Sequence, residues 1–198
     1  MRVIAGRFRS RKLKTVPGIA VRPTPDRLRE SLFNVLAPRI EGAVFLDAYA
    51  GTGAVGIEAL SRGAKHVIFI ERSGKAMEVL RENLRALGVE KEVTVVRGSA
   101  AVLLPNYPED IAFVDPPYEE GQEYVDALEA LSRSGCRLAI AQHASRIALE
   151  TRYGELTKTR VLKQGDNSLS FYEPSAREQE MDIHHVGSGG ASADQIVE

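Results

Sequence analysis

Hydrophobic and polar positions alternate along this chain in blocks that predict strands and helices in turn. Short apolar runs rich in β-branched residues predict buried strands at 44–46, 66–70, 93–96, 111–114 and 137–141. Apolar residues spaced three or four apart predict helices at about 54–62, 73–87 and 124–131. Strands that alternate with helices are typical of a doubly wound, Rossmann-like α/β fold with a mostly parallel sheet.

The two ends of this block add smaller elements. Strands predicted at 159–162 and 169–172, around the turn Gly165-Asp166-Asn167, would form an antiparallel hairpin at one sheet edge. Near the start, apolar residues interleaved with basic ones and a turn at Gly6 predict a small β-hairpin. A further helix is expected to begin at Pro25 with Thr24 as its cap and to end before Pro38. Its apolar face would leave Arg27 and Arg29 for the solvent or a ligand, together with Arg22 in front of it.

Length and composition fit one domain with a sizeable core. The chain has 198 residues, and its 43% hydrophobic and 27% charged residues are ordinary for a globular protein. We expect an α/β domain over 21–174, preceded by an extension over 1–20 and followed by a flexible acidic and polar tail over 175–198.

Several classes of protein fit this composition poorly. Cys136 is the single cysteine and the histidines form no ligand pattern, so neither a disulfide framework nor a metal site is expected. No apolar run is long enough for a membrane span, and the first residues lack the apolar centre of a signal peptide. We therefore expect a soluble, cytoplasmic protein, as a monomer and without a metal.

Charge is distributed unevenly although the formal net charge is only −1. The first fourteen residues contain no acid, and their six cations are Arg2, Arg7, Arg9, Arg11, Lys12 and Lys14. A hairpin with one packed face and one basic face suits contact with nucleic-acid phosphates, whereas the alternative is a solvated basic terminus. Arg22, Thr24 and Arg27 are the next candidates for nucleic-acid contact.

Asp115-Pro116-Pro117-Tyr118 directly follows the apolar run at 111–114. In a parallel sheet the carboxyl end of a strand faces the ligand crevice, and two prolines make a stiff corner there. The Asp115 carboxylate and the Pro116 carbonyl would offer two acceptors to an amino group, and the Tyr118 ring could stack on a flat molecule. The alternative is a turn that only ends the strand.

A glycine-rich loop follows the first predicted strand and permits two interpretations. Gly51-Thr52-Gly53-Ala54-Val55-Gly56 matches the dinucleotide fingerprint, and Glu71 stands where a ribose-binding acid is expected, so an NAD-dependent enzyme is one candidate. Asp47, however, leaves the strand before the loop, and a carboxylate there would repel a pyrophosphate. It favours a cationic ligand such as the amino-acid end of S-adenosylmethionine.

Asp47 and the glycine loop follow the first predicted strand, Glu71 ends the second, and the Asp115 corner follows the fourth. This arrangement resembles that of class I S-adenosylmethionine-dependent methyltransferases that act on amino groups. The chain resembles the RsmD-type family more narrowly, over roughly residues 1–174. The resemblance rests on Asp115-Pro116-Pro117-Tyr118 and three further stretches, at 22–30, 46–53 and 58–64. Glu58-Ala59-Leu60-Ser61-Arg62-Gly63-Ala64 is the most family-specific of them.

The resemblance implies transfer of a methyl group from S-adenosylmethionine to N2 of a guanine in 16S ribosomal RNA. It implies that Asp115, Pro116, Pro117 and Tyr118 hold the base, with positioning more important than base catalysis. It also implies a cofactor site formed by Asp47, Ala48, Ala50, Gly51, Gly53, Glu71, Arg72 and Ser99. Two positions depart from the family pattern: Ser99 replaces an acid that would bind adenine, and Gln142-His143 stands where a Glu is common.

Three alternatives remain open from the sequence. The Asp-Pro-Pro-Tyr corner also occurs in adenine-N6 methyltransferases, so those residues do not choose the base. An NAD-dependent Rossmann enzyme and a catalytically silent RNA-binding module are the other two.

Overall fold

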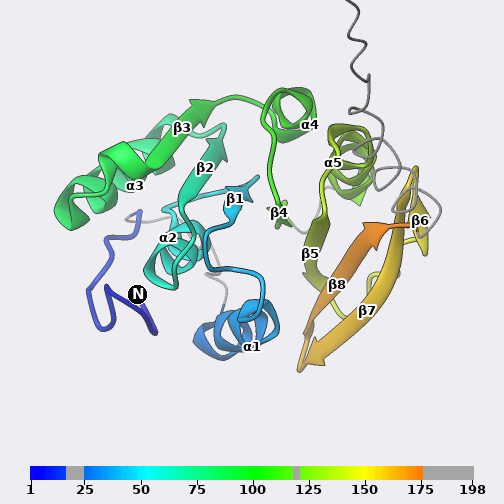
Figure 1. The fold of residues 1–198 in the computed structure, drawn as a ribbon, viewed down its shortest axis with the longest axis horizontal. Helices are drawn as coiled ribbons and strands as arrows, with labels where there is room; N and C mark the ends of the chain where they lie inside the picture. Colours follow the sequence, from blue (N-terminus) through cyan, green and yellow to red (C-terminus); the bar gives the residue numbers. More distant parts are fainter. Residues whose placement is uncertain (17–24, 118–120, 176–198) are drawn as a thin grey trace, which may run out of the picture.

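A computed structural model of the chain describes residues 1–16, 25–117 and 121–175. Within these residues the strands form an eight-stranded sheet in the order β3-β2-β1-β4-β5-β8-β7-β6 (Figure 1). The strands are β1 (Val44–Asp47), β2 (His66–Glu71), β3 (Val93–Arg97), β4 (Ile111–Val114), β5 (Leu138–Ala144), β6 (Arg152–Tyr153), β7 (Leu156–Gln164) and β8 (Asn167–Pro174). The pairs from β3 to β5 are parallel, and β8, β7 and β6 extend the sheet with antiparallel pairs.

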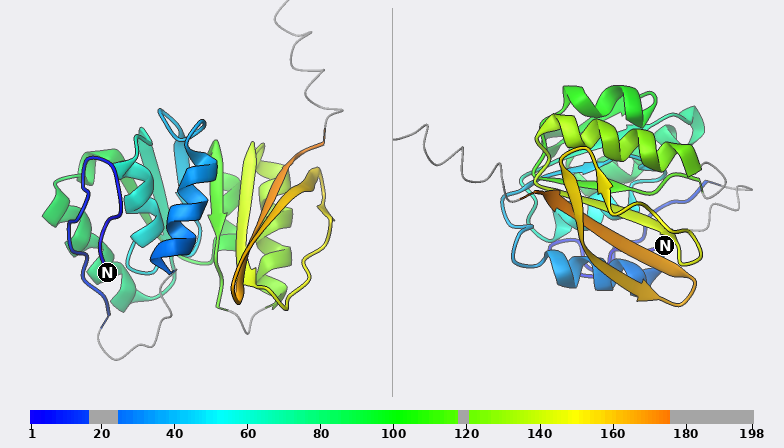
Figure 2. Two further views of the ribbon diagram at one scale, coloured as in Figure 1. Left: turned by 90° about the horizontal axis from the view of Figure 1, so that it is seen from below. Right: turned by 90° about the vertical axis from the view of Figure 1, so that its right-hand side faces the viewer.

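Helices cover both faces of the sheet (Figures 1 and 2). The α-helices are α1 (Asp26–Leu36), α2 (Ala54–Ser61), α3 (Gly74–Leu87), α4 (Ala100–Leu103) and α5 (Gly121–Ser134), and the 3-10 helices are η1 (Glu90–Glu92) and η2 (Leu104–Asn106). Adjacent strand residues point to opposite faces, so Phe45 joins the core under α1, α2 and α3, and Leu46 joins the core under α4 and α5.

The predicted fold class is confirmed, including the antiparallel edge and the position of β1 beside β4. β5 continues three residues beyond the predicted end at Ala141, because β8 pairs with Gln142, His143 and Ala144. The elements not predicted from the sequence are α4, both 3-10 helices and the two-residue strand β6, all of which are too short for a periodic signal.

The N-terminal segment retains a hairpin, although Arg2 and Lys12 form its single regular antiparallel bridge within the described residues. The Val3 N–H donates across to the Arg11 carbonyl and the Leu13 N–H to the Met1 carbonyl, each at 3.0 Å. Regular pairing goes no further because the N–H groups at residues 4, 5 and 8 bond to side chains on α2. Residues 17–20 of the predicted extension lie outside the described residues.

Helix α1 begins at Asp26, with Pro25 as its N-cap residue rather than its first helical residue. The expectation that Arg29 faces solvent or a ligand is wrong, since this side chain is 0% exposed. Its guanidinium donates to the Arg2 carbonyl at 2.6 Å and to Asp26 at 3.0 Å. Arg29 therefore helps to hold the N-terminal segment.

None of the helices among the described residues combines the length and the apolar character needed to cross a bilayer.

Candidate active site

The site lies at the carboxyl ends of the central strands, where β1 ends in Asp47 and the chain turns into the glycine loop. This loop bonds to the strands on both sides: the Ala48 N–H donates to the Phe113 carbonyl on β4 and the Ala50 N–H to the Ile70 carbonyl on β2, each at 2.9 Å. The loop is therefore fixed across the point at which the strand order reverses, which is where open α/β sheets bind ligands.

Glu71 and Asp115 flank this loop. Asp47 is in register with Phe69 on β2 and Phe113 on β4, so Glu71 and Asp115 each lie two residues beyond its level. Strands are spaced about 4.8 Å apart, which places these acidic positions on the order of 10 Å from one another across β1. The structure thus brings together the predicted cofactor acid and the predicted amine-holding corner on one edge of the sheet.

Glu71 is held by backbone donors on both oxygens. The Gly51 N–H donates to one carboxylate oxygen and the Ser73 N–H to the other, both at 2.7 Å. Gly53 has φ of +87°, and a Cβ there would lie 2.4 Å from Leu80 Cδ1. Glycine is needed at this position because an L side chain would be strained and would clash with α3. The glycine loop and the Glu71 carboxylate are therefore held in one fixed arrangement.

Asp47 lies beneath this loop and is 2% exposed. Its carboxylate accepts from the Gly56 N–H in the first turn of α2 at 3.0 Å. Burial, with a smaller contribution from the nearby Glu71 carboxylate, raises the pKa of Asp47 to about 7, while hydrogen bonds from the backbone oppose the shift. Asp47 therefore fills the anion-binding N-terminus of α2 with its own carboxyl group, and that leaves no place there for a pyrophosphate.

The raised pKa of Asp47 predicts a pH dependence of stability. The unfolded chain loses this proton near pH 3.8 and the folded chain near pH 7, so the folded state binds more protons between them. The free energy of unfolding should therefore fall as the pH rises through that window, by on the order of 4 kcal/mol.

Urea unfolding at a series of pH values measures this effect. Asp47→Asn retains an acceptor for the Gly56 N–H and removes the titrating group. The free energy of unfolding of this variant should therefore depend less on pH than that of the wild type. Glu109, whose pKa burial also raises to about 7, remains in both proteins and cancels in the comparison. Parallel curves for the two proteins would contradict the assigned pKa.

The corner after β4 has the predicted position. Asp115 is half-buried, Pro116 is buried and Pro117 is exposed, whereas Tyr118 lies outside the described residues. Next to this corner, Arg72 pairs with Glu123 on α5 at 2.9 Å, so the side chain predicted to bind cofactor bridges β2 and α5.

Tyr49 and Glu123 also lie in this region and were not among the predicted site residues. The Tyr49 hydroxyl reaches the Glu123 carbonyl at 3.5 Å, and burial raises the pKa of this phenol. An aromatic residue inside a glycine loop is the signal that could have singled out Tyr49.

The departures from the family pattern have different surroundings. Ser99 is exposed and is the N-cap residue of α4, just past the end of β3, so its predicted contact with adenine stays a prediction. Gln142 and His143 do not follow β5 but lie inside it and are 1% and 4% exposed. His143 contacts the Ala144 carbonyl and the Ser170 hydroxyl, and burial lowers its pKa, which favours the neutral ring.

The six predicted RNA-binding cations of the N-terminal segment are all exposed. Three of them also contact this chain: Arg7 pairs with Glu92, Lys14 with Glu82 at 2.8 Å, and Arg11 donates to the Ala86 carbonyl at 3.2 Å. Arg27 is exposed on α1, and Arg22 and Thr24 lie outside the described residues.

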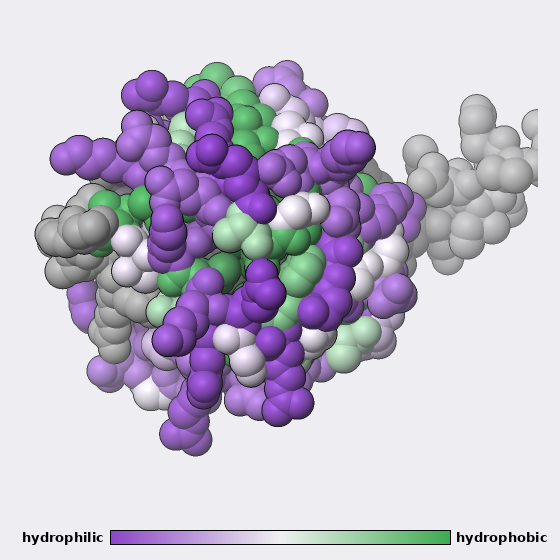
Figure 3. Space-filling view, turned by 90° about the vertical axis from the view of Figure 1, so that its left-hand side faces the viewer, coloured by the Kyte–Doolittle hydropathy of each residue, from purple (hydrophilic) through white to green (hydrophobic). Residues whose placement is uncertain are grey.

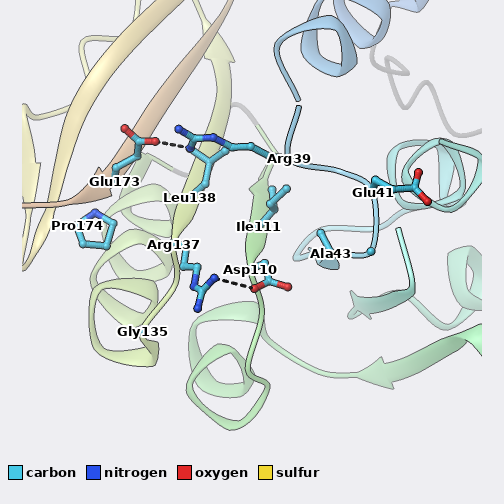
Figure 4. Close-up of a pocket in the computed structure, with 11 residues that line it drawn as sticks. Arg39, Glu41, Ala43, Asp110, Ile111, Gly135, Arg137, Leu138, Glu173 and Pro174 are labelled. Atoms are coloured by element: carbon cyan, nitrogen blue, oxygen red, sulfur yellow. Dashed lines mark hydrogen bonds and ion pairs between the residues drawn. The ribbon is translucent and has the colours of Figure 1, made fainter. Parts of the chain in front are cut away.

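A pocket of about 890 Å³ lies at the opposite, amino-terminal edge of the sheet (Figure 4). Arg39 pairs with Glu173 there, and Arg137 lies 3.9 Å from Asp110, which also accepts from the Val44 N–H at 2.9 Å. None of the predicted site residues lines this pocket. Four of its five charged side chains are in these two ion pairs, and Asp110 supports β1, so we do not assign the function to this pocket.

No group of three or more His, Cys, Asp or Glu side chains in residues 1–16, 25–117 and 121–175 is arranged to hold a metal ion.

Comparison with known proteins identifies the family to which this chain belongs. Residues 1–173 match the family described as conserved hypothetical protein 95. The chain belongs to this family. "Putative rRNA methyltransferase YlbH" of Bacillus subtilis is 36% identical over 183 residues, which span 87% of this chain and 98% of that protein. "Ribosomal RNA small subunit methyltransferase D" of Escherichia coli K12 is 42% identical over 133 residues, 65% of this chain and 67% of that protein.

A solved structure agrees with these relatives of the family. "Putative methyltransferase yhhF" of Escherichia coli superposes with a TM-score of 0.78 at 34% identity, and the match covers 89% of this chain and 99% of that one. These likenesses confirm the RsmD-type resemblance and the Rossmann-like methyltransferase fold.

Proposed function

We propose that this chain transfers a methyl group from S-adenosylmethionine to the exocyclic N2 amino group of a guanine in small-subunit ribosomal RNA. The observation that carries the proposal is the placement of the glycine loop and Glu71 on one side of the β1 end and Asp115-Pro116 on the other. The names of the relatives direct the proposal to ribosomal RNA.

The cofactor site fits S-adenosylmethionine better than a dinucleotide. Glu71 presents a carboxylate already oriented by Gly51 and Ser73, which suits a ribose diol. The backbone of the glycine loop would hold the methionine part, and Ser99 would lie toward the adenine. When bound, this cofactor supplies an electrophilic methyl group on a sulfonium.

On the substrate side, the chain has to orient a weak nucleophile. The lone pair of guanine N2 is delocalised into the ring, so hydrogen bonds to the Asp115 carboxylate and the Pro116 carbonyl would aim it and offset developing positive charge. The target base has to leave its stack to reach this corner. Tyr118, although outside the described residues, is the proposed stacking partner.

Titration separates this proposal from the NAD-dependent alternative. We expect S-adenosylmethionine to bind the purified chain and NAD to give no heat above dilution in a calorimeter. Because Asp47 occupies the N-terminus of α2, tight NAD binding would contradict the account.

A further inference from the structure

The N-terminal segment is bound to the end of α2 by its backbone. The Ile4 and Ala5 N–H groups donate to the two carboxylate oxygens of Glu58 at 2.8 and 3.0 Å. The Arg7 N–H donates to the Ser61 carbonyl at 2.8 Å and the Phe8 N–H to the Ser61 hydroxyl at 3.0 Å. Glu58 and Ser61 belong to the most family-specific sequence stretch, 58–64. No residue of this stretch has a role in the proposed cofactor or substrate site.

Glu58 is an unusual anchor because it is 0% exposed. Arg62 donates to it at 2.8 Å, and Arg29 Nε lies 3.9 Å away. The desolvation cost of a fully buried carboxylate has to be offset by nearby positive charge and by hydrogen bonds. Two of these hydrogen bonds come from the N-terminal segment. The segment is therefore part of the structure of the domain rather than a loose extension.

A second anchor lies beside the cofactor loop. Asn83 on α3 is 2% exposed; its side-chain oxygen accepts from the Lys14 N–H at 2.8 Å, and its amide donates to the Lys14 carbonyl at 3.1 Å. The same amide donates to the Thr52 carbonyl at 3.0 Å. One side chain thus connects the N-terminal segment to the glycine loop.

These anchors determine which cations face outward. Val3 and Leu13 are buried in the core, so their neighbours Arg2 and Lys12, which are bridge partners, project to the opposite side. Arg2, Arg9 and Lys12 are exposed, and none of their side chains has an ion-pair or hydrogen-bond partner within the described part of the chain. Figure 3 shows the left-hand side of the Figure 1 view, where hydrophilic side chains surround a smaller hydrophobic area.

We propose that Glu58, Ser61 and Asn83 are positioning residues for the RNA substrate. They fix residues 2–14 on α2 and α3 so that Arg2, Arg9 and Lys12 contact RNA phosphates at a set distance from the cofactor loop. This inference rests on the proposed function, because it takes RNA as the ligand of the basic face.

Gly6→Ala tests the anchor at α2. Gly6 has φ of +80°, and a Cβ there would lie 1.7 Å from the Ser61 carbonyl oxygen. Gly42→Ala is the matched control, because Gly42 has φ of +72° and its Cβ would meet no atom within 4 Å. We expect Gly6→Ala to raise KM for small-subunit RNA at least about tenfold, as phosphate contacts are lost, with kcat and the Kd of S-adenosylmethionine unchanged. Gly42→Ala should match the wild type in all three.

Ser61→Ala probes the same anchor without a steric clash. It removes the hydrogen bonds with Phe8 and Ala5, so KM should rise in the same direction by a smaller factor. If Gly6→Ala and Ser61→Ala both leave KM unchanged, or if they weaken cofactor binding as much as RNA binding, the positioning role is wrong.

The double variant Arg9→Gln/Lys12→Gln tests the basic face. Its slope of log K for RNA against log salt should be smaller by about 2 than that of the wild type. Lys65→Gln/Arg133→Gln removes the same charge from exposed positions elsewhere and should leave the slope unchanged. Equal slopes in all three proteins would overturn the proposal, whereas a wild type that neither binds nor methylates RNA would refute the proposed function itself.

Discussion

Asp115→Ala is expected to reduce methyl transfer to RNA by a factor on the order of 10² to 10³, while S-adenosylmethionine binds as in the wild type. The reason is that, in the proposed mechanism, Asp115 is one of the two acceptors that would orient the amino group and offset its developing charge. Asp115 lies past the end of β4, on the other side of β1 from Glu71, so the loss should not reach the cofactor. Single-turnover transfer of labelled methyl measures the effect.

Two further variants sharpen this prediction. Asp115→Asn retains a carbonyl acceptor and should keep part of the activity, because the proposed mechanism relies more on positioning than on proton abstraction. Glu129→Ala, an exposed acid on α5, is the control and should behave as the wild type. Wild-type transfer by Asp115→Ala would remove the corner from the mechanism.

Glu71→Ala should weaken S-adenosylmethionine binding by about 10- to 100-fold, because hydrogen bonds to a charged acceptor contribute about 1.5–3 kcal/mol. The carboxylate is expected to hold the ribose and also accepts from Gly51 and Ser73, so its loss loosens the loop as well. Calorimetric titration gives the Kd. Glu78→Ala on the exposed face of α3 is the matched control. A Kd for Glu71→Ala within twofold of the wild type would show that the ribose is held elsewhere.

Much of the fold could be predicted because its signals are local. The run Ile111–Val114 is apolar throughout and is a strand buried along its whole length. Asp47, Glu71 and the Asp115 corner each directly follow or end such a run, so the parallel topology alone placed them on one edge.

The rest depended on contacts between distant parts of the chain. Arg29 is buried because Arg2 and Glu58 meet it from two other segments. The N-terminal hairpin has little regular strand because its middle residues bond to α2, and no local pattern encodes those bonds. β5 is longer than its apolar run because β8 pairs beside it.

Asn83 was nevertheless detectable from the sequence. It is a polar residue on the apolar face formed by Leu80, Leu84 and Leu87, and a polar residue in such a stripe often has a buried partner. Arg29 gives the same signal beside Leu28 and Leu32.

Analysis of the methylated nucleoside tests the central claim most directly. Labelled S-adenosylmethionine would be incubated with the purified chain and with naked 16S ribosomal RNA, assembled small subunit or DNA, side by side, followed by digestion and chromatography of the nucleosides. The account predicts label in N2-methylguanosine from one of the two RNA substrates and none from DNA. Label in N6-methyladenine, or no transfer to any substrate by a chain that binds the cofactor, would contradict it.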